Sequence, residues 1–198
     1  MNLELYLYDR ILPIIQNWTE KNIYAISFYV YSNEAYEYNG KSNVSEFSIG
    51  YCTEDGCNHA SPLSEERWNL MWHRQGEAYI IKPQNGRNVA NEGAKVLFDW
   101  YRENGIKNIG FEDGDNDFDE DMNYIGKGPV GYYELLKAVS NVARRLQTEG
   151  EIAVRFGCTP IIVHDLEYPW YIEEATENAN PNGEAAVFLK ALKERFIG

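Results

Sequence analysis

The densest group of chemically active side chains lies between residues 112 and 121, which read Glu-Asp-Gly-Asp-Asn-Asp-Phe-Asp-Glu-Asp. Seven of these ten residues are acidic and none is basic. Carboxylates this close together repel one another, so such a run is stabilised when a cation or a basic partner offsets the repulsion. We predict that the acidic residues of this run contact a partner, namely Glu112, Asp113, Asp115, Asp117, Asp119, Glu120 and Asp121.

The alternation of aspartates in this run is also typical of a calcium loop, although the spacing does not fit an EF-hand. An EF-hand loop requires Gly at its sixth position and Glu at its twelfth. Counted from Asp113, these positions hold Phe118 and Tyr124, and the register that starts at Asp115 fails in the same way. Three readings stay open: a solvated loop, a contact surface for a basic partner, and a calcium or magnesium site of another kind.

Zinc ligands occur in the segment Cys52-x4-Cys57-x-His59, with His73 further along the chain. Thiolates and imidazoles bind zinc, but a structural site needs a second pair of ligands, and the fourth ligand is not evident here. The odd number of cysteines, three, also argues against a disulfide scaffold. We therefore predict no metal site and no cofactor.

Candidates for catalysis are confined to the neighbourhood of His164 and Asp165, at the end of an apolar run. A carboxylate beside a histidine can tune its pKa, and Cys158 would supply a nucleophile if the chain bent back. However, adjacent residues on a strand point to opposite faces, and no Gly-x-Ser-x-Gly motif is present. The glycines of residues 126–131 do not form a Walker motif. The sequence therefore predicts a protein that is not an enzyme.

Aromatic side chains supply a second kind of candidate contact. Most of the tryptophans, including Trp68, Trp72 and Trp100, are expected in the core. The segment Tyr168-Pro169-Trp170-Tyr171 is the one most expected to be partly exposed, and Trp and Tyr dominate the energetics of many interfaces. We predict that Tyr168, Trp170 and Tyr171 anchor a partner.

Bulk composition restricts which partners are favourable. The chain has 198 residues and a formal net charge of −13, with a pI near 4.7. Such a field repels nucleic acid and anionic membranes and speeds encounter with basic partners. The first residues carry acids where a signal peptide needs basic residues, and no stretch reaches the ~20 apolar residues of a membrane span. We expect a cytoplasmic protein that binds neither nucleic acid nor membrane.

Hydrophobic periodicity predicts one α+β domain over residues 1–198, with a mainly antiparallel sheet packed against several helices. The expected strands cover residues 23–31, 47–52, 78–81, 152–156 and 160–164. The expected helices cover residues 3–21 with an interruption near Pro13, a segment beginning after Ser64, and residues 91–104, 132–149, 169–178 and 184–196.

The chain resembles a group of small bacterial domains in three places. These are the segment Pro160-Ile-Ile-Val-His-Asp-Leu-Glu-Tyr, the later Asn180-Pro181-Asn182-Gly183, and the strand that begins at Ile23. Some of those domains are immunity proteins of polymorphic toxin systems. The resemblance covers about a third of the chain and carries no catalytic signature. It implies a cytosolic antitoxin that neutralises a toxin by tight binding.

Charge and resemblance together lead to the hypothesis of an immunity protein that binds a basic toxin domain through its acidic run. The alternative is a metal-dependent enzyme or sensor that uses residues 112–121 to bind calcium, magnesium or zinc.

Overall fold

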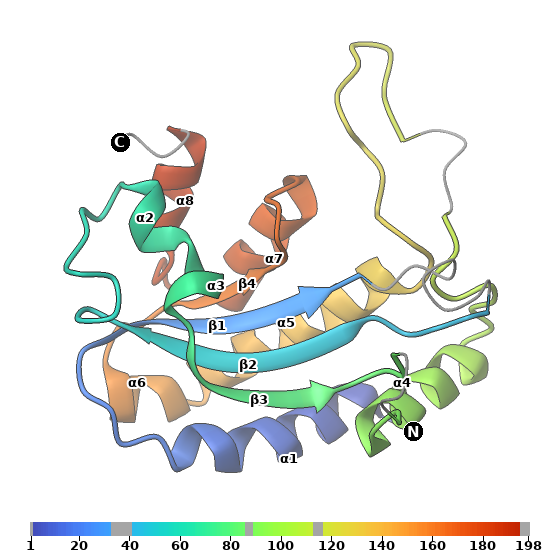
Figure 1. The fold of residues 1–198 in the computed structure, drawn as a ribbon, viewed down its shortest axis with the longest axis horizontal. Coiled ribbons are helices and arrows are strands. Elements are labelled where there is room, and N and C mark those ends of the chain that lie inside the picture. The colour runs from blue at the N-terminus through green and yellow to red at the C-terminus, as the bar shows by residue number, and fades with distance from the viewer. Residues whose placement is uncertain (1, 33–40, 86–88, 113–116, 195–198) are drawn as a thin grey trace.

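A four-stranded sheet forms the centre of the computed structural model, which describes residues 2–32, 41–85, 89–112 and 117–194 (Figure 1). The strand order is β3-β2-β1-β4. β1 pairs antiparallel with β2, β2 pairs antiparallel with β3, and β4 pairs parallel with β1. The predicted α+β class with a mainly antiparallel sheet is therefore confirmed. The strands are β1 (Ile23–Tyr31), β2 (Glu46–Thr53), β3 (Gln75–Ile81) and β4 (Ile161–His164).

β1 lies inside the sheet and is buried on both faces, which explains why its sequence is apolar or aromatic almost throughout. Ile26, Phe28 and Val30 enter the main core, as their alternation predicts. The same alternation predicts that Tyr24 shares that face, and this prediction is wrong. The register of β1 against β2 shifts between Ile23 and Ala25, and Tyr24 packs in a second core on the other face.

The main core lies between one face of the sheet and four helices (Figure 1), and buried residues of a fifth helix, α7 (Trp170–Ala179), also belong to it. Asn2 caps the first of them by accepting a hydrogen bond from the Leu5 amide. Pro13 lies inside this helix, which nevertheless continues to Gln16 and ends before the predicted residue 21. The helices are α1 (Leu3–Gln16), α4 (Glu92–Glu103), α5 (Tyr132–Thr148) and α6 (Glu151–Phe156).

The second core covers part of the opposite face with shorter elements. Trp68 and Phe188 form its aromatic centre, with ring centroids 5.2 Å apart, and Ile162 contributes from the sheet. These elements are α2 (Glu65–Trp68), α3 (Leu70–His73) and α8 (Ala186–Lys193), while α7 (Trp170–Ala179) packs on β4 and α5.

One predicted strand, residues 152–156, is wrong because it forms helix α6. Gly150 ends α5 with a φ of 82°, and the chain then resumes a helical course. Ile152 is buried in the main core and Phe156 packs against it four residues later, whereas Val154 between them is exposed. Burial of residues four apart, with an exposed residue between them, is typical of a helix. A segment of only five residues cannot be assigned to a helix rather than a buried strand from its composition.

Among the described residues, no helix combines the length and the apolarity that crossing a membrane requires. That one domain extends over all of residues 1–198 stays a prediction.

The outer edge of β4 is closed by side chains from α7 and its C-terminal end. Asn180 accepts from the Ile161 amide at 2.9 Å and donates to the Ile161 carbonyl at 2.7 Å. Thr176 accepts from the Val163 amide at 3.2 Å and donates to its carbonyl at 2.9 Å. Backbone groups at a sheet edge need partners when they are buried. The two side chains therefore replace a fifth strand.

Replacing Asn180 with Ala should lower the free energy of unfolding by roughly 3 kcal/mol, because it leaves the buried Ile161 amide and carbonyl without partners. Urea denaturation measures the change. The matched control is Asn182→Ala, since Asn182 is exposed and bonds only to nearby Glu184. Equal stabilities of the two variants would contradict this account of the edge.

Candidate functional site

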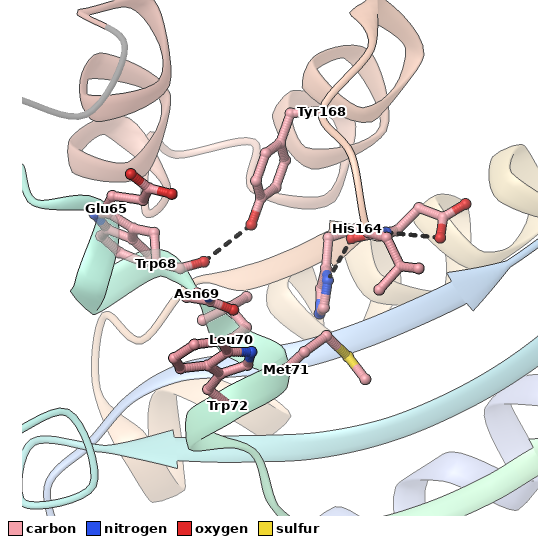
Figure 2. Close-up of a pocket in the computed structure, with 10 residues that line it drawn as sticks. Glu65, Trp68, Asn69, Leu70, Met71, Trp72, His164 and Tyr168 are labelled. Atoms are coloured by element: carbon pink, nitrogen blue, oxygen red, sulfur yellow. Dashed lines mark hydrogen bonds between the residues drawn. The ribbon is translucent and has the colours of Figure 1, made fainter.

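A pocket of about 370 Å³ opens where α2 and α3 face the loop that joins β4 to α7. We call it the α2–β4 pocket. Figure 2 shows residues of the α2–α3 segment on one side, with His164 and Tyr168 on the other. Its ten lining residues come from two segments: Glu65 and residues 68–72 from the first, and residues 164–166 and 168 from the second.

Trp68 fixes the first wall to the body of the protein. Its side chain is only 3% exposed, packs edge-on against Tyr24 and Phe188, and donates from Nε1 to the Pro62 carbonyl at 2.8 Å. Ser64 caps the short helix α2 by accepting from the Arg67 amide. The start of this wall is therefore held by the second core.

The helix breaks at Asn69, and this break sets the direction of Trp72. Asn69 has φ −76° and ψ 69°, which is not helical, and it separates α2 from α3. Leu70 then turns into the core, whereas Trp72 is 83% exposed. The expectation that Trp72 packs in the core is wrong, because it assumed one continuous helix in which residues 68 and 72 share a face.

The second wall is joined to the first by a direct hydrogen bond. The Tyr168 hydroxyl donates to the Trp68 carbonyl at 2.9 Å (Figure 2). Tyr168 also packs against Phe188, with ring centroids 5.6 Å apart. A residue predicted to anchor a partner thus closes the pocket on one side, and its neighbour Leu166 is 62% exposed.

His164 forms part of the pocket lining and is almost fully buried. Its Nδ1 lies 3.2 Å from the Asp165 carbonyl and its Nε2 lies 2.7 Å from Ser27 Oγ. A carbonyl oxygen only accepts, so Nδ1 carries the proton and Nε2 accepts from the serine. Burial lowers the pKa of His164 to about 3. The histidine is therefore a neutral structural link between β1 and β4.

The Asp165 carboxylate is the polar group next to His164. It accepts from the Leu166 amide at 2.7 Å and from the Tyr132 hydroxyl at 3.0 Å. Burial raises the pKa of this carboxyl, while hydrogen bonds from Leu166, Tyr132 and the Ser32 backbone lower it by a smaller amount. The Cys158–His164 pair that a bend in the chain would allow is not observed, since Cys158 is exposed and His164 bonds to Ser27.

The described acids of the run, Glu112, Asp117, Asp119, Glu120 and Asp121, are not among the residues that line the α2–β4 pocket. Asp113 and Asp115 fall outside the described residues, while Glu112, Glu120 and Asp121 are exposed. Asp119 closes a turn by accepting from the Asp121 amide at 2.9 Å and the Asn123 amide at 2.8 Å, and hydrogen bonds from Asn123 lower its pKa. That these acids contact a partner stays a prediction.

Gly126 connects one acid of the run, Asp117, to one of the predicted aromatic anchors, Trp170. Trp170 Nε1 donates to the Gly126 carbonyl at 3.1 Å, and Asp117 lies so close to Gly126 that a side chain there would clash with it. Trp170 remains partly exposed, whereas Tyr171 is only 8% exposed and packs against Tyr132. Tyr171 therefore supports α7 against α5.

Within the described ranges, no group of three His, Cys, Asp or Glu side chains is placed to hold a metal ion. Cys52 and Cys57 are buried thiols, and His59 forms an exposed ion pair with Asp55 at 3.1 Å. His73 Nε2 lies 2.8 Å from the Glu66 carbonyl. The candidate zinc ligands thus have other partners or lie in the core.

Comparison with known proteins gives one match. Residues 63–136 match the model of the OAA-family lectin sugar binding domain, which is less than half of the 198-residue chain. No curated protein and no solved structure matches. The matched segment contains α2, α3, β3, α4 and the start of α5, and six of the ten residues that line the α2–β4 pocket lie within it.

This match corrects the functional hypotheses drawn from the sequence. The resemblance to immunity proteins is wrong, and with it the basic toxin partner, because the match is to a sugar-binding domain. The alternative metal-dependent enzyme or sensor is not supported either. The match is to a binding domain, and to that extent it agrees with the prediction of a protein that is not an enzyme.

The buried neutral His164 predicts a specific acid sensitivity. Between pH about 6.5 and 3, the unfolded chain binds a proton at this histidine that the folded chain does not. Stability should therefore fall as pH decreases through this window, with a contribution of up to about 1.4 kcal/mol per pH unit. Urea denaturation from pH 7 to pH 4 should give a shallower decline for His164→Asn than for the unmodified protein.

The control for this measurement is His59→Asn, because His59 is exposed and its contact with Asp55 lies on the surface. That variant should keep the pH dependence of the unmodified protein. Parallel stability curves for His164→Asn and the unmodified protein would show that His164 is not held neutral by the fold.

Proposed function

We propose that this protein binds a saccharide in the α2–β4 pocket without catalysing a reaction on it. The observation that carries the proposal is the exposed indole of Trp72, which borders the pocket and belongs to the segment that matches the lectin sugar binding domain. A large aromatic side chain on the surface costs free energy in water unless a ligand covers it.

The chemistry of a pyranose ring matches the side chains around Trp72. Such a ring has a face of C–H groups, which packs on an aromatic plane, and a rim of hydroxyls, which need hydrogen-bond partners. Trp72 offers the aromatic surface, while Met71 and Leu166 extend it with apolar groups. Pockets that combine apolar walls with a few polar groups are the usual form of small-molecule sites, and 370 Å³ lies within their range of ~300–1,000 Å³.

Polar partners for the hydroxyl rim come from both walls. The Asn69 side chain makes no capping hydrogen bond to α3, so its amide is available as both donor and acceptor. The Glu65 carboxylate is exposed at the start of α2, and Asp165 lies on the opposite wall. A carboxylate has about four acceptor positions, so Asp165 has capacity left beyond the Tyr132 hydroxyl and the Leu166 and Ser32 amides.

The test is a glycan array followed by calorimetric titration of the best ligand. Trp72→Ala should weaken binding at least tenfold, which is about 1.4 kcal/mol, because it removes the aromatic surface without touching the core. Trp72→Phe should retain part of the affinity.

Phe118→Ala is the matched control, because Phe118 is also an exposed aromatic residue of the matched segment but lies outside the pocket. This variant should bind as the unmodified protein does. An array with no bound glycan, or a Trp72→Ala variant of full affinity, would overturn the proposed site.

A further inference from the structure

The charged residues that line the α2–β4 pocket are all acidic. Two carboxylates, Glu65 and Asp165, are among its ten lining residues, and no Lys or Arg is. Glu65 lies in the first turn of α2 with an exposed side chain. Asp165 is less exposed, and a charge in such a place is less screened by water than one on the open surface.

The cations that flank the first wall in sequence are both engaged elsewhere. Arg67 donates to both carboxylate oxygens of Glu54 and lies over the Tyr24 ring, 4.1 Å from its centroid. Arg74 has a side chain that is only 3% exposed, pairs with Glu77 at 3.1 Å and donates to Ser48. Arg74 also lies 3.9 Å from the Met71 sulfur beside the pocket, but its charge is already paired with Glu77, so neither guanidinium is left to pair with an acidic ligand.

His164 does not supply a positive charge either. Its two nitrogens are occupied by Ser27 and the Asp165 carbonyl, and the ring is buried. A ligand in the α2–β4 pocket therefore meets carboxylates, a neutral imidazole, an amide and aromatic rings. The net charge of −13 adds a repulsion of the same sign for any anionic ligand.

We propose that the α2–β4 pocket selects saccharides that carry a free amine over saccharides that carry an acidic group. This selection rests on the proposed saccharide-binding function and adds the ligand class. The protonated amine of a hexosamine gains attraction from Glu65 and Asp165. The carboxylate of a hexuronate meets the same two groups without a cation to pair with.

The experiment uses matched monosaccharides in the gluco, manno and galacto configurations. Each configuration is tested as the neutral hexose, the 2-amino sugar, the N-acetylated 2-amino sugar and the hexuronate. Binding is followed by the NMR signal of the Trp72 indole N–H, assigned among the five tryptophans by the Trp72→Phe variant. The N-acetylated sugar controls for the size of the substituent without its charge.

The expected result is an affinity about two- to fivefold higher for the amino sugar than for the hexose, as partly exposed ion pairs give, and a lower affinity for the hexuronate. Glu65→Gln should reduce the preference for the amine. Glu66→Gln should leave it unchanged, because Glu66 is the exposed neighbour that does not line the pocket.

Two further outcomes separate this inference from the proposed function. If neutral hexoses move the Trp72 signal and hexuronates bind equally well or better, selection by charge is overturned while the saccharide site stands. If the N-acetylated sugar binds as well as the free amine, the preference does not come from charge and the inference is likewise overturned. If no sugar moves the Trp72 signal, both the inference and the saccharide site are contradicted.

Discussion

The parallel pairing of β4 with β1 is the constraint on which the arrangement of the pocket depends. It places residues 164–168 beside α2 and α3, which lie about a hundred residues earlier in the chain. Asn180 and Thr176 close the outer edge of β4, and the hydrogen bond between His164 and Ser27 joins its end to β1. All of these groups are buried, so an unpaired partner would be costly.

This rigid support explains how a site can be built on short, irregular segments. α2 and α3 have only four residues each, too few to be stable without tertiary contacts. Trp68 supplies those contacts by entering the second core, and Tyr168 ties the two walls together. Binding surfaces on loops held by a firm scaffold are common, because the loops need not contribute to the core themselves. Trp72 is accordingly exposed at no cost to the packing beneath it.

The sequence predicted those parts of the structure whose signal is local. The apolar alternation of β1 and the helical period of α5 are strong, and both elements form as predicted. Trp72 was assigned to the core because its spacing from Trp68 fits one helix, and the break at Asn69 has no strong local signal. The link between Ser27 and His164 depends on strand register across more than a hundred residues, which composition does not reveal. The acidic run is prominent in the sequence because of its charge, yet none of its described residues lines the pocket.

The most direct measurement of the central claim is a crystal structure of the protein with the strongest glycan from the array. The account predicts a sugar ring packed on the Trp72 indole, with hydroxyls within hydrogen-bond distance of Asn69 and of Glu65 or Asp165. A glycan bound on another surface, with Trp72 still open to solvent, would contradict it.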